Sequence, residues 1–261
     1  MTMLSLGATR SFLSSSFSLT FSPSKRHLNF SSLKSSIRMA STASSTIEHI
    51  VLFKVKENTD SSKLNSMISS LNALVSLDSV LHIAAVPLHR VKSSPVPFTH
   101  MLHSRYSSKE DLSAYSAHPS HVSVVKESVL PICDDIMAVD WVAHDLQGPV
   151  VLSPGSAVRL TLLKLKENLG EEVKNEILTV ISGIKGSFGG IQQLTCGENF
   201  SPARAKGYSI ASLAVFPGLS EIDALDANEE LVNLQKEKVR DYLDSVIVLD
   251  SIVPSPQSSS L

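Results

Sequence analysis

The middle of the chain repeats itself at a constant spacing of 110 residues, and this repeat constrains the fold more than any other feature. The pairs that share this spacing are VLFKVKEN at 51–58 with TLLKLKEN at 161–168, FTHMLHSRY at 98–106 with YSIASLAVF at 208–216, and IMAVDWV at 136–142 with VIVLDSI at 246–252. Because the three pairs need no net insertion or deletion, we expect two copies of one domain. Their expected bounds are 47–145 and 157–254, with a linker containing Gly and Pro at 146–156.

Each copy has the same expected order of elements. In the first copy they are an alternating strand at 49–56, an amphipathic helix at 61–77, a strand at 80–88, a loop at 89–97, a strand at 98–106, helical segments at 107–117 and 118–133, and a strand at 136–142. The order β-α-β-β-α-α-β predicts an α+β domain with both helical regions on one face of a four-stranded sheet. The other, apolar face then needs a partner, and two such sheets facing each other would close a barrel.

The two ends of the chain differ in composition from the repeats. Residues 1–46 contain no Asp or Glu, are rich in Ser and carry several Arg and Lys, as in an organelle transit peptide or a disordered segment. Residues 255–261 are expected to be a disordered tail, and its last three residues, Ser-Ser-Leu, resemble the peroxisome address Ser-Lys-Leu. We therefore expect the peroxisome as location, with the chloroplast as the alternative.

The overall composition argues against two classes of partner. A net charge of −2 gives no indication of binding to nucleic acid or to an anionic membrane surface. No segment approaches the roughly 18 consecutive apolar residues of a membrane span. The two cysteines, Cys133 and Cys196, lack a metal-ligand spacing and favour a reducing compartment.

The segment AYSAHPSHV at 114–122 carries the candidate chemistry. Tyr115, His118 and His121 recur every three residues, which places them near one face of a helical segment, and Pro119 is expected to begin a new helix. Histidine titrates near neutral pH and tyrosine keeps its proton, so the pair suits removal of a proton next to a carbonyl. In the structural alternative, His118 caps the break between two helices and the other two side chains are buried polar groups.

The order of elements, and a strand containing His100 followed by the pattern Y-x-x-H-P-x-H at 115–121, resemble the plant stress-responsive dimeric α/β barrel (Dabb) family. The resemblance covers both copies, and the tandem form is similar to plant two-domain members. It implies an α+β fold of two tandem ferredoxin-like (dimeric α/β barrel) domains packed sheet to sheet as an intramolecular pseudo-dimer. Further association into homodimers stays open.

The first copy is also similar to olivetolic acid cyclase, a single-domain member of this family that closes a polyketide chain by aldol condensation. That similarity implies Tyr115 and His121 as the acid and base. The residues that it implies as lining or supporting the pocket are His49, His100 and His118. The residues of the second copy at the five corresponding positions are Arg159, Ile210, Leu225, Asn228 and Leu231. Since these cannot take over proton transfer, we expect one site per chain.

The family resemblance also implies a metal site. Some members hold Mg²⁺ through main-chain carbonyls at the end of the first helix, and by register the residues here would be Val75, Asp78 and Leu81. Main-chain oxygens suit such a hard cation. No other cofactor is expected.

Three further histidines are expected to be solvated or locally hydrogen-bonded: His89, His103 and His144.

Two functions remain open at the level of the sequence. The first is a stress-response protein that binds a small apolar or acyl ligand in a cavity of the first copy and acts in stress or defence. The alternative is a cyclase- or lyase-type enzyme acting on a polyketide-like substrate through Tyr115 and His121. The retained polar residues favour the enzyme, whereas most members of this fold class have no known reaction, which favours binding.

Overall fold

The computed structural model describes residues 45–144 and 146–254. The elements of the first repeat are β1 (Ser45–Val55), α1 (Ser61–Ala73), the 3-10 turn η1 (Leu74–Ser76), β2 (His82–Ser93), β3 (His100–Tyr106), α2 (Lys109–Ala117), α3 (Pro119–Val124), the π-helical turn η2 (Val125–Val129) and β4 (Cys133–His144). Nearly all of the expected targeting segment, up to residue 44, and the whole tail from 255 lie outside the described residues.

The second repeat has the same order of strands and main helices. Its elements are β5 (Ala157–Leu165), α4 (Glu171–Ser187), β6 (Gln193–Glu198), the 3-10 turn η3 (Pro202–Arg204), β7 (Ile210–Phe216), α5 (Leu219–Ala227), α6 (Glu229–Val239), the 3-10 turn η4 (Arg240–Tyr242) and β8 (Leu243–Ile252). The expected α+β order is thus confirmed in both copies. No helix in the described part of the chain is long and apolar enough to cross a membrane.

Local sequence explains where the helices of the first repeat begin. The carboxylate of Asp60 accepts a hydrogen bond from the Ser62 N–H at 2.7 Å and caps α1. The hydroxyl of Ser108 accepts one from the Asp111 N–H at 3.0 Å and caps α2. The acidic residues in the first turn of α2 stabilise the start of this helix further, because they lie near the positive end of the helix dipole.

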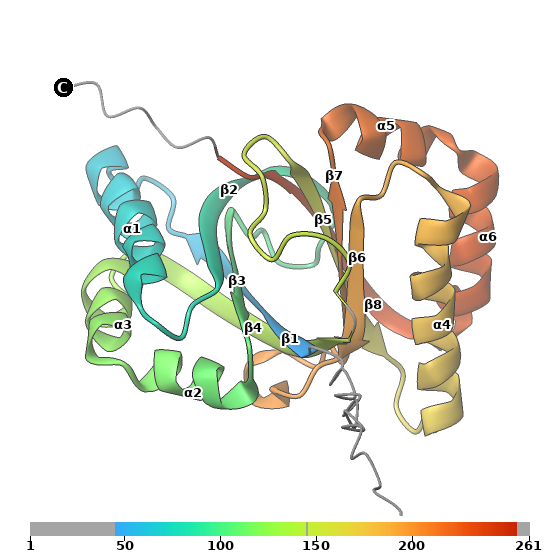
Figure 1. Ribbon diagram of the computed structural model, residues 1–261, viewed down its shortest axis with the longest axis horizontal. Helices are drawn as coiled ribbons and strands as arrows, with labels where there is room; N and C mark the ends of the chain where they lie inside the picture. Colours follow the sequence, from blue (N-terminus) through green and yellow to red (C-terminus); the bar gives the residue numbers. More distant parts are fainter. Residues whose placement is uncertain (1–44, 145, 255–261) are drawn as a thin grey trace, which may run out of the picture. The chain divides into compact units, whose positions relative to one another are not determined.

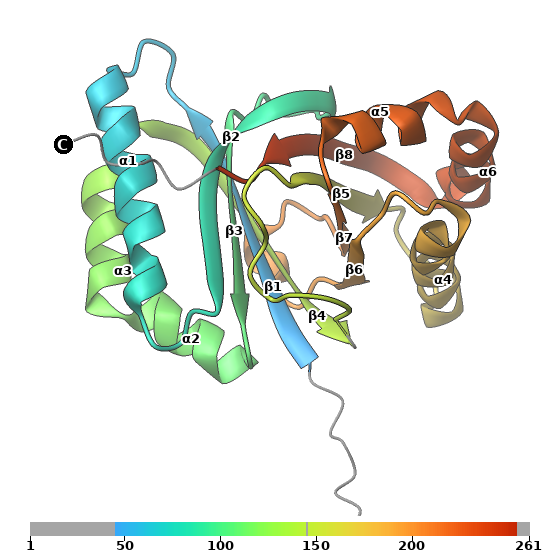
Figure 2. The ribbon, with the colours of Figure 1, turned by 45° about the horizontal axis from the view of Figure 1, so that its top comes forward.

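The strands form one eight-stranded antiparallel sheet in the order β4-β1-β3-β2-β8-β5-β7-β6. Its two halves are joined where β2 pairs with β8, and the outer strands β4 and β6 approach each other on the opposite side (Figures 1 and 2). The approach is held by hydrogen bonds from the Phe200 N–H to the Asp140 carbonyl at 2.9 Å and from the Asp140 N–H to Asn199 Oδ1 at 3.0 Å. The expected intramolecular pair of sheets is therefore confirmed as a nearly closed barrel.

The boundary expected after residue 88 is wrong. The sequence predicts a loop from residue 89, yet β2 continues to Ser93. The extension pairs with the second repeat, where Arg90 lies opposite Asp250 and Val91 opposite Leu249. Because the partner strand lies in the other copy, the pattern of the first copy alone does not indicate the longer strand.

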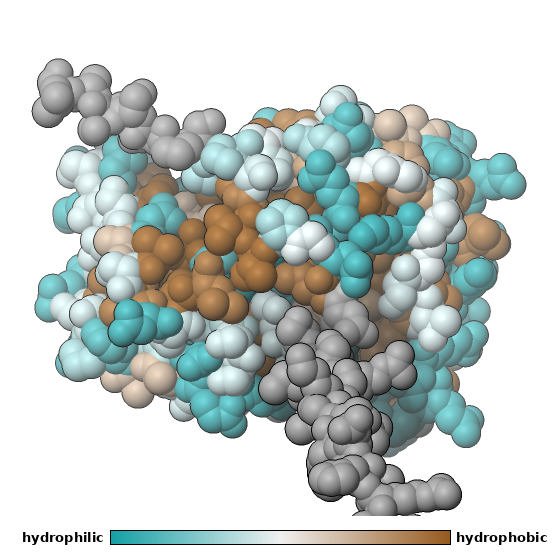
Figure 3. All heavy atoms as spheres, viewed as in Figure 1, coloured by the Kyte–Doolittle hydropathy of each residue, from teal (hydrophilic) through white to brown (hydrophobic). Residues whose placement is uncertain are grey.

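Successive side chains along each strand point to opposite faces of the sheet, so the two faces form two separate hydrophobic cores. Side chains such as Leu52 and Leu162, one from each repeat, meet inside the barrel in a single cluster. Those on the other face, such as Phe53 and Leu102, pack beneath the helices of their own repeat. The side of the molecule that is seen in Figure 3 has an apolar area in its middle, over β2 and β3, and hydrophilic residues toward the outer helices.

The barrel also encloses a buried polar network that connects the two repeats. Glu48 lies opposite Arg105 on the neighbouring strand, and their side chains form an ion pair at 3.0 Å with both residues fully buried. Glu48 also accepts hydrogen bonds from His103 at 2.6 Å and from the Thr195 hydroxyl at 3.0 Å. Arg105 reaches the linker carbonyl of Val150 at 2.7 Å. The expectation that His103 is solvated or locally bonded is therefore wrong, because it points into the barrel.

Candidate functional site

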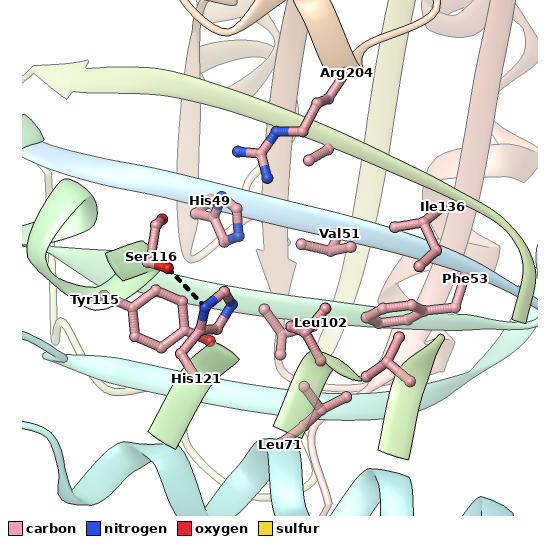
Figure 4. Close-up of a pocket in the computed structure, with 13 residues that line it drawn as sticks. His49, Val51, Phe53, Leu71, Leu102, Tyr115, Ser116, His121, Ile136 and Arg204 are labelled. Carbon is pink, nitrogen blue, oxygen red and sulfur yellow. Dashed lines mark hydrogen bonds between the residues drawn. The ribbon is translucent and has the colours of Figure 1, made fainter. Parts of the chain in front are cut away.

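A cavity of about 140 Å³ lies between the sheet of the first repeat and its helices. Figure 4 shows His49, Tyr115 and His121 at one end and Phe53 and Ile136 toward the other. The remaining apolar lining comes chiefly from β1, β3 and β4 on one side and from α1 and η2 on the other: Val51, Leu71, Leu102, Val125, Val129 and Ala138. The cavity is therefore a mostly apolar space with a polar end.

His49 at the polar end is held by an acidic partner that sequence reasoning missed. It lies opposite Asp140 on the neighbouring strand β4, and both side chains are almost fully buried. The imidazole Nδ1 is hydrogen-bonded to Asp140 Oδ1. Burial alone would raise the pKa of Asp140, but the hydrogen bond and charge of His49 outweigh it and hold that pKa below its usual range. An ionised carboxylate only accepts, so Nδ1 carries the proton and the tautomer is fixed.

Tyr115 projects from α2 into the same end of the cavity. Its ring centroid lies 4.5 Å from that of His121 and 6.4 Å from that of His49. Burial raises the pKa of the phenol to about 12, against a smaller opposing effect of a hydrogen bond with Tyr106. Tyr115 is therefore a protonated hydrogen-bond donor at neutral pH.

His121 on α3 is oriented by the helix before it. Its Nδ1 lies 3.0 Å from the Ser116 carbonyl oxygen, and because a carbonyl only accepts, Nδ1 donates the proton (Figure 4). Burial is the main cause that lowers the pKa of His121. The neutral ring then has an unprotonated Nε2, which is the atom that a general base requires.

The other two predicted pocket residues do not line the cavity. His118 ends α2 and caps α3, because its Nδ1 accepts the Ser120 N–H at 3.2 Å, which is the structural role weighed from the sequence. His100 lies at the start of β3 with its Nδ1 2.8 Å from the Thr99 hydroxyl. The structure thus brings together three of the five predicted side chains, and their catalytic or binding roles stay predictions.

The three residues predicted to hold Mg²⁺ lie in η1 and the turn before β2. Val75 and Leu81 are exposed apolar residues, and Asp78 lies between them at the surface. The described residues contain no group of three or more His, Cys, Asp or Glu that could hold a metal ion. A site here would therefore depend on main-chain oxygens, whose chemistry suits Mg²⁺.

The second repeat contributes one residue to the polar end. Arg204, the last residue of η3, lines the cavity, and its guanidinium lies 4.0 Å from Asp140 Oδ2. Figure 4 shows the side chain projecting toward His49. No sequence signal identifies Arg204, since it belongs to a loop of the other copy. Asp140 did leave one, because an acid recurs at the same place in the segments IMAVDWV at 136–142 and VIVLDSI at 246–252, as Asp140 and Asp250.

The corresponding place in the second repeat is filled by ion pairs. Arg159, at the position of His49, donates to Asp250 at 2.7 Å and to Asp226 at 2.6 Å. Arg90 and Lys92 of the first repeat approach the same acids, at 3.4 Å from Asp250 and 2.6 Å from Asp226. These paired charges occupy the position that His49 has in the first repeat, and the expectation of one site per chain stays a prediction.

Comparisons with known proteins agree with the repeat and the fold. The family described as Stress responsive A/B Barrel Domain (Dabb) matches residues 47–143 and again 157–253. The chain is 63% identical over 228 residues to a stress-response A/B barrel domain-containing protein of Arabidopsis thaliana, covering 87% of this chain and 86% of that protein. It is 52% identical over 216 residues to a second stress-response A/B barrel domain-containing protein of the same plant, covering 81% of this chain and 99% of that protein.

A solved structure resembles the whole two-repeat arrangement. An anthrone oxidase-like protein superposes with a TM-score of 0.52 over 84% of this chain and 98% of that chain. The sequence identity is 11%, so this likeness concerns the fold alone.

Proposed function

The chain belongs to the stress-responsive A/B barrel (Dabb) family, and we propose that it binds one small, mostly apolar molecule in the cavity of the first repeat. The observation that carries the proposal is a single space that combines an apolar lining with the polar end formed by His49, Tyr115 and His121. Ligand sites usually have this composition, in which apolar walls supply affinity and a few polar groups fix orientation.

The volume of the cavity limits the size of the ligand. About 140 Å³ is close to the apolar cavities of roughly 150 Å³ that accept benzene in other proteins. A single ring or a short acyl chain would fill it, with its oxygen atoms toward Tyr115 and His121. Binding of such a molecule in stress or defence is the role that we propose for the chain.

A second candidate function is favoured by the protonation states at the polar end. The unprotonated Nε2 of His121 could take a proton from a carbon next to a carbonyl, while Tyr115 donates a hydrogen bond to the oxygen that becomes negative. The protonated His121 could return the proton to the product oxygen, and the unprotonated Nε2 of His49, oriented by Asp140, could accept a hydrogen bond from a ligand hydroxyl. This division of roles supports a cyclase- or lyase-type reaction on a small carbonyl compound.

Ligand binding is tested by calorimetric titration of the full chain with neutral single-ring compounds such as benzamide and toluene. Val51→Phe places a larger side chain in the cavity and is expected to abolish binding. Thr161→Phe, at the corresponding position of β5, is the matched control and is expected to leave binding intact. Binding that survives Val51→Phe unchanged, or that is absent in the wild type, would contradict the proposal.

Two further proposals concern regions that the cavity does not touch. Mg²⁺ bound by the carbonyls of Val75, Asp78 and Leu81 would connect the end of α1 to the start of β2. Backbone amide shifts confined to residues 74–82 on titration with Mg²⁺ would support this site.

The peroxisome, with the chloroplast as alternative, is the location that we propose from the end segments of the sequence. Imaging of the full chain with and without its last three residues tests that location.

A further inference from the structure

We propose that Arg204 makes the cavity of the first repeat select ligands that carry a carboxylate. This inference rests on the proposed function and adds a ligand class to it. Arg204 is a charged side chain supplied by the second repeat to the polar end of a cavity built otherwise by the first. A guanidinium presents several N–H donors in a plane, which matches the two oxygens of a carboxylate.

The donors of Arg204 are available to a ligand. Its side chain is 58% exposed, and its ionic contact with Asp140 is 4.0 Å long, beyond hydrogen-bond distance. Two other arginines lie in the corresponding region of the second repeat, and both form short ion pairs with aspartates. Arg90 lies 2.6 Å from Asp223, and Arg159 lies 2.7 Å from Asp250. Arg204 differs from both in facing a cavity rather than a filled ion cluster.

The charges around Arg204 favour an anion over a cation. Asp140, the acid nearest to it, is buried: its Oδ1 accepts from His49 and its Oδ2 lies 4.0 Å from Arg204, whose exposed guanidinium is then the outermost charge of this pair. Tyr115 and a neutral His121 add no negative charge to this end. A ligand carboxylate placed between Arg204 and Tyr115 would meet donors, while its hydrocarbon part would lie against the apolar walls.

The same arrangement gives the second repeat a role in binding. In the second repeat, Arg159 and two aspartates occupy the place that corresponds to the polar end of the cavity. The η3 turn of the same repeat lies next to β4 of the first repeat. Fusion of the two copies in one chain fixes which of them supplies the arginine and which supplies the cavity.

The test compares benzoate with benzamide, which has the same shape without the charge, by calorimetry at pH 7. In Arg204→Gln we expect the benzoate affinity to fall about tenfold, because a charge-assisted contact is lost, while the benzamide affinity changes less than about twofold. Arg204→Lys keeps a positive charge without the planar pair of donors and is expected to weaken benzoate by an intermediate factor. Lys206→Gln removes a neighbouring charge that pairs with Asp135 and is expected to leave both affinities unchanged.

The two ligands separate failure of this inference from failure of the proposed function. Benzamide bound by wild type and by Arg204→Gln, with benzoate weakened no more than in Lys206→Gln, would overturn the role of Arg204 and leave the cavity as a binding site. Equal weakening of both ligands by Arg204→Gln would also overturn it, since that result indicates a structural effect. Failure of wild type to bind either compound would overturn both proposals.

Discussion

His49 and Asp140 lie opposite each other on β1 and β4, and the imidazole Nδ1 donates to the Asp140 carboxylate beneath the helices of the first repeat. Both side chains are buried, so the pair is shielded from competing water. This contact fixes which nitrogen of His49 faces the cavity, and it links the residue that the sequence identified to one that it did not.

Replacement of Asp140 by Asn is expected to lower the free energy of unfolding by about 1–3 kcal/mol, because a buried charge-assisted hydrogen bond is lost. The ring nitrogen shifts of His49, measured by NMR, should change from one tautomer to a mixture of two. Asp135→Asn on the same strand removes only a partly exposed pair with Lys206 and should cost less than about 1 kcal/mol. Equal losses in the two variants would show that the buried pair has no special role.

Removal of the Tyr115 hydroxyl is expected to weaken carbonyl ligands selectively. In Tyr115→Phe we expect the affinity for benzamide to fall about fivefold, the usual size of one neutral hydrogen bond, while toluene binding is unchanged. Tyr208→Phe is the matched control, because the Tyr208 hydroxyl lies 3.0 Å from that of Ser245 in the second repeat and does not line the cavity. A loss of benzamide binding in Tyr208→Phe as large as in Tyr115→Phe would contradict the assignment.

Stability is expected to decrease in mild acid because His82 is buried in the barrel beside His103, with ring centroids 5.0 Å apart. Burial, and then the charges of His103 and Arg105, lower the pKa of His82 to about 3 against an opposing effect of Glu48. An unfolded histidine titrates near 6.5, so between these values the unfolded chain binds a proton that the folded chain does not. The stabilisation is therefore complete above pH 6.5 and is lost as the pH falls from 6.5 toward 3.

The test is urea unfolding at pH 7.5 and pH 5.0. Linkage predicts that His82→Leu reduces the difference in unfolding free energy between the two pH values by about 2 kcal/mol. His144→Leu replaces an exposed histidine at the end of β4 and should retain the wild-type difference. An unchanged difference in His82→Leu would rule out His82 as a source of the acid sensitivity.

The ion cluster of the second repeat is expected to be structural. Arg159→Met leaves two carboxylates without their main partner, including the fully buried Asp250, and should cost about 3 kcal/mol. Lys164→Met removes an exposed pair with Asp244 and should cost less than about 1 kcal/mol. Both variants should bind benzamide as the wild type does. A specific loss of binding in folded Arg159→Met would place a ligand site in the second repeat.

The repeat made the fold predictable. Strands such as 51–58 and 161–168 alternate in the same phase, and the unpaired apolar face of each four-stranded sheet required the other. The extension of β2 to Ser93 and the polar network of Glu48 and Arg105 were not predictable, because their partners lie in the other repeat or on a neighbouring strand.

The candidate site was predictable only where its residues are close in sequence. Tyr115 and His121 fall on either side of Pro119, and the helix break turns both toward one cavity. Asp140 lies 91 residues from His49, and Arg204 comes from a turn of the other copy. Spacing along the chain carries no information about such contacts. The one available signal was the acid that recurs, as Asp140 and Asp250, within the matching segments 136–142 and 246–252.

The most direct test of the account is a methyl NMR titration of the full chain with benzamide. One-to-one binding in the first repeat predicts saturable shifts for the methyl groups of Val51, Leu102 and Val125, with those of the second repeat and the barrel interior unaffected. Shifts that instead centre on the second repeat, or no saturable shift at ligand concentrations well above the protein, would contradict a single ligand site beneath the helices of the first repeat.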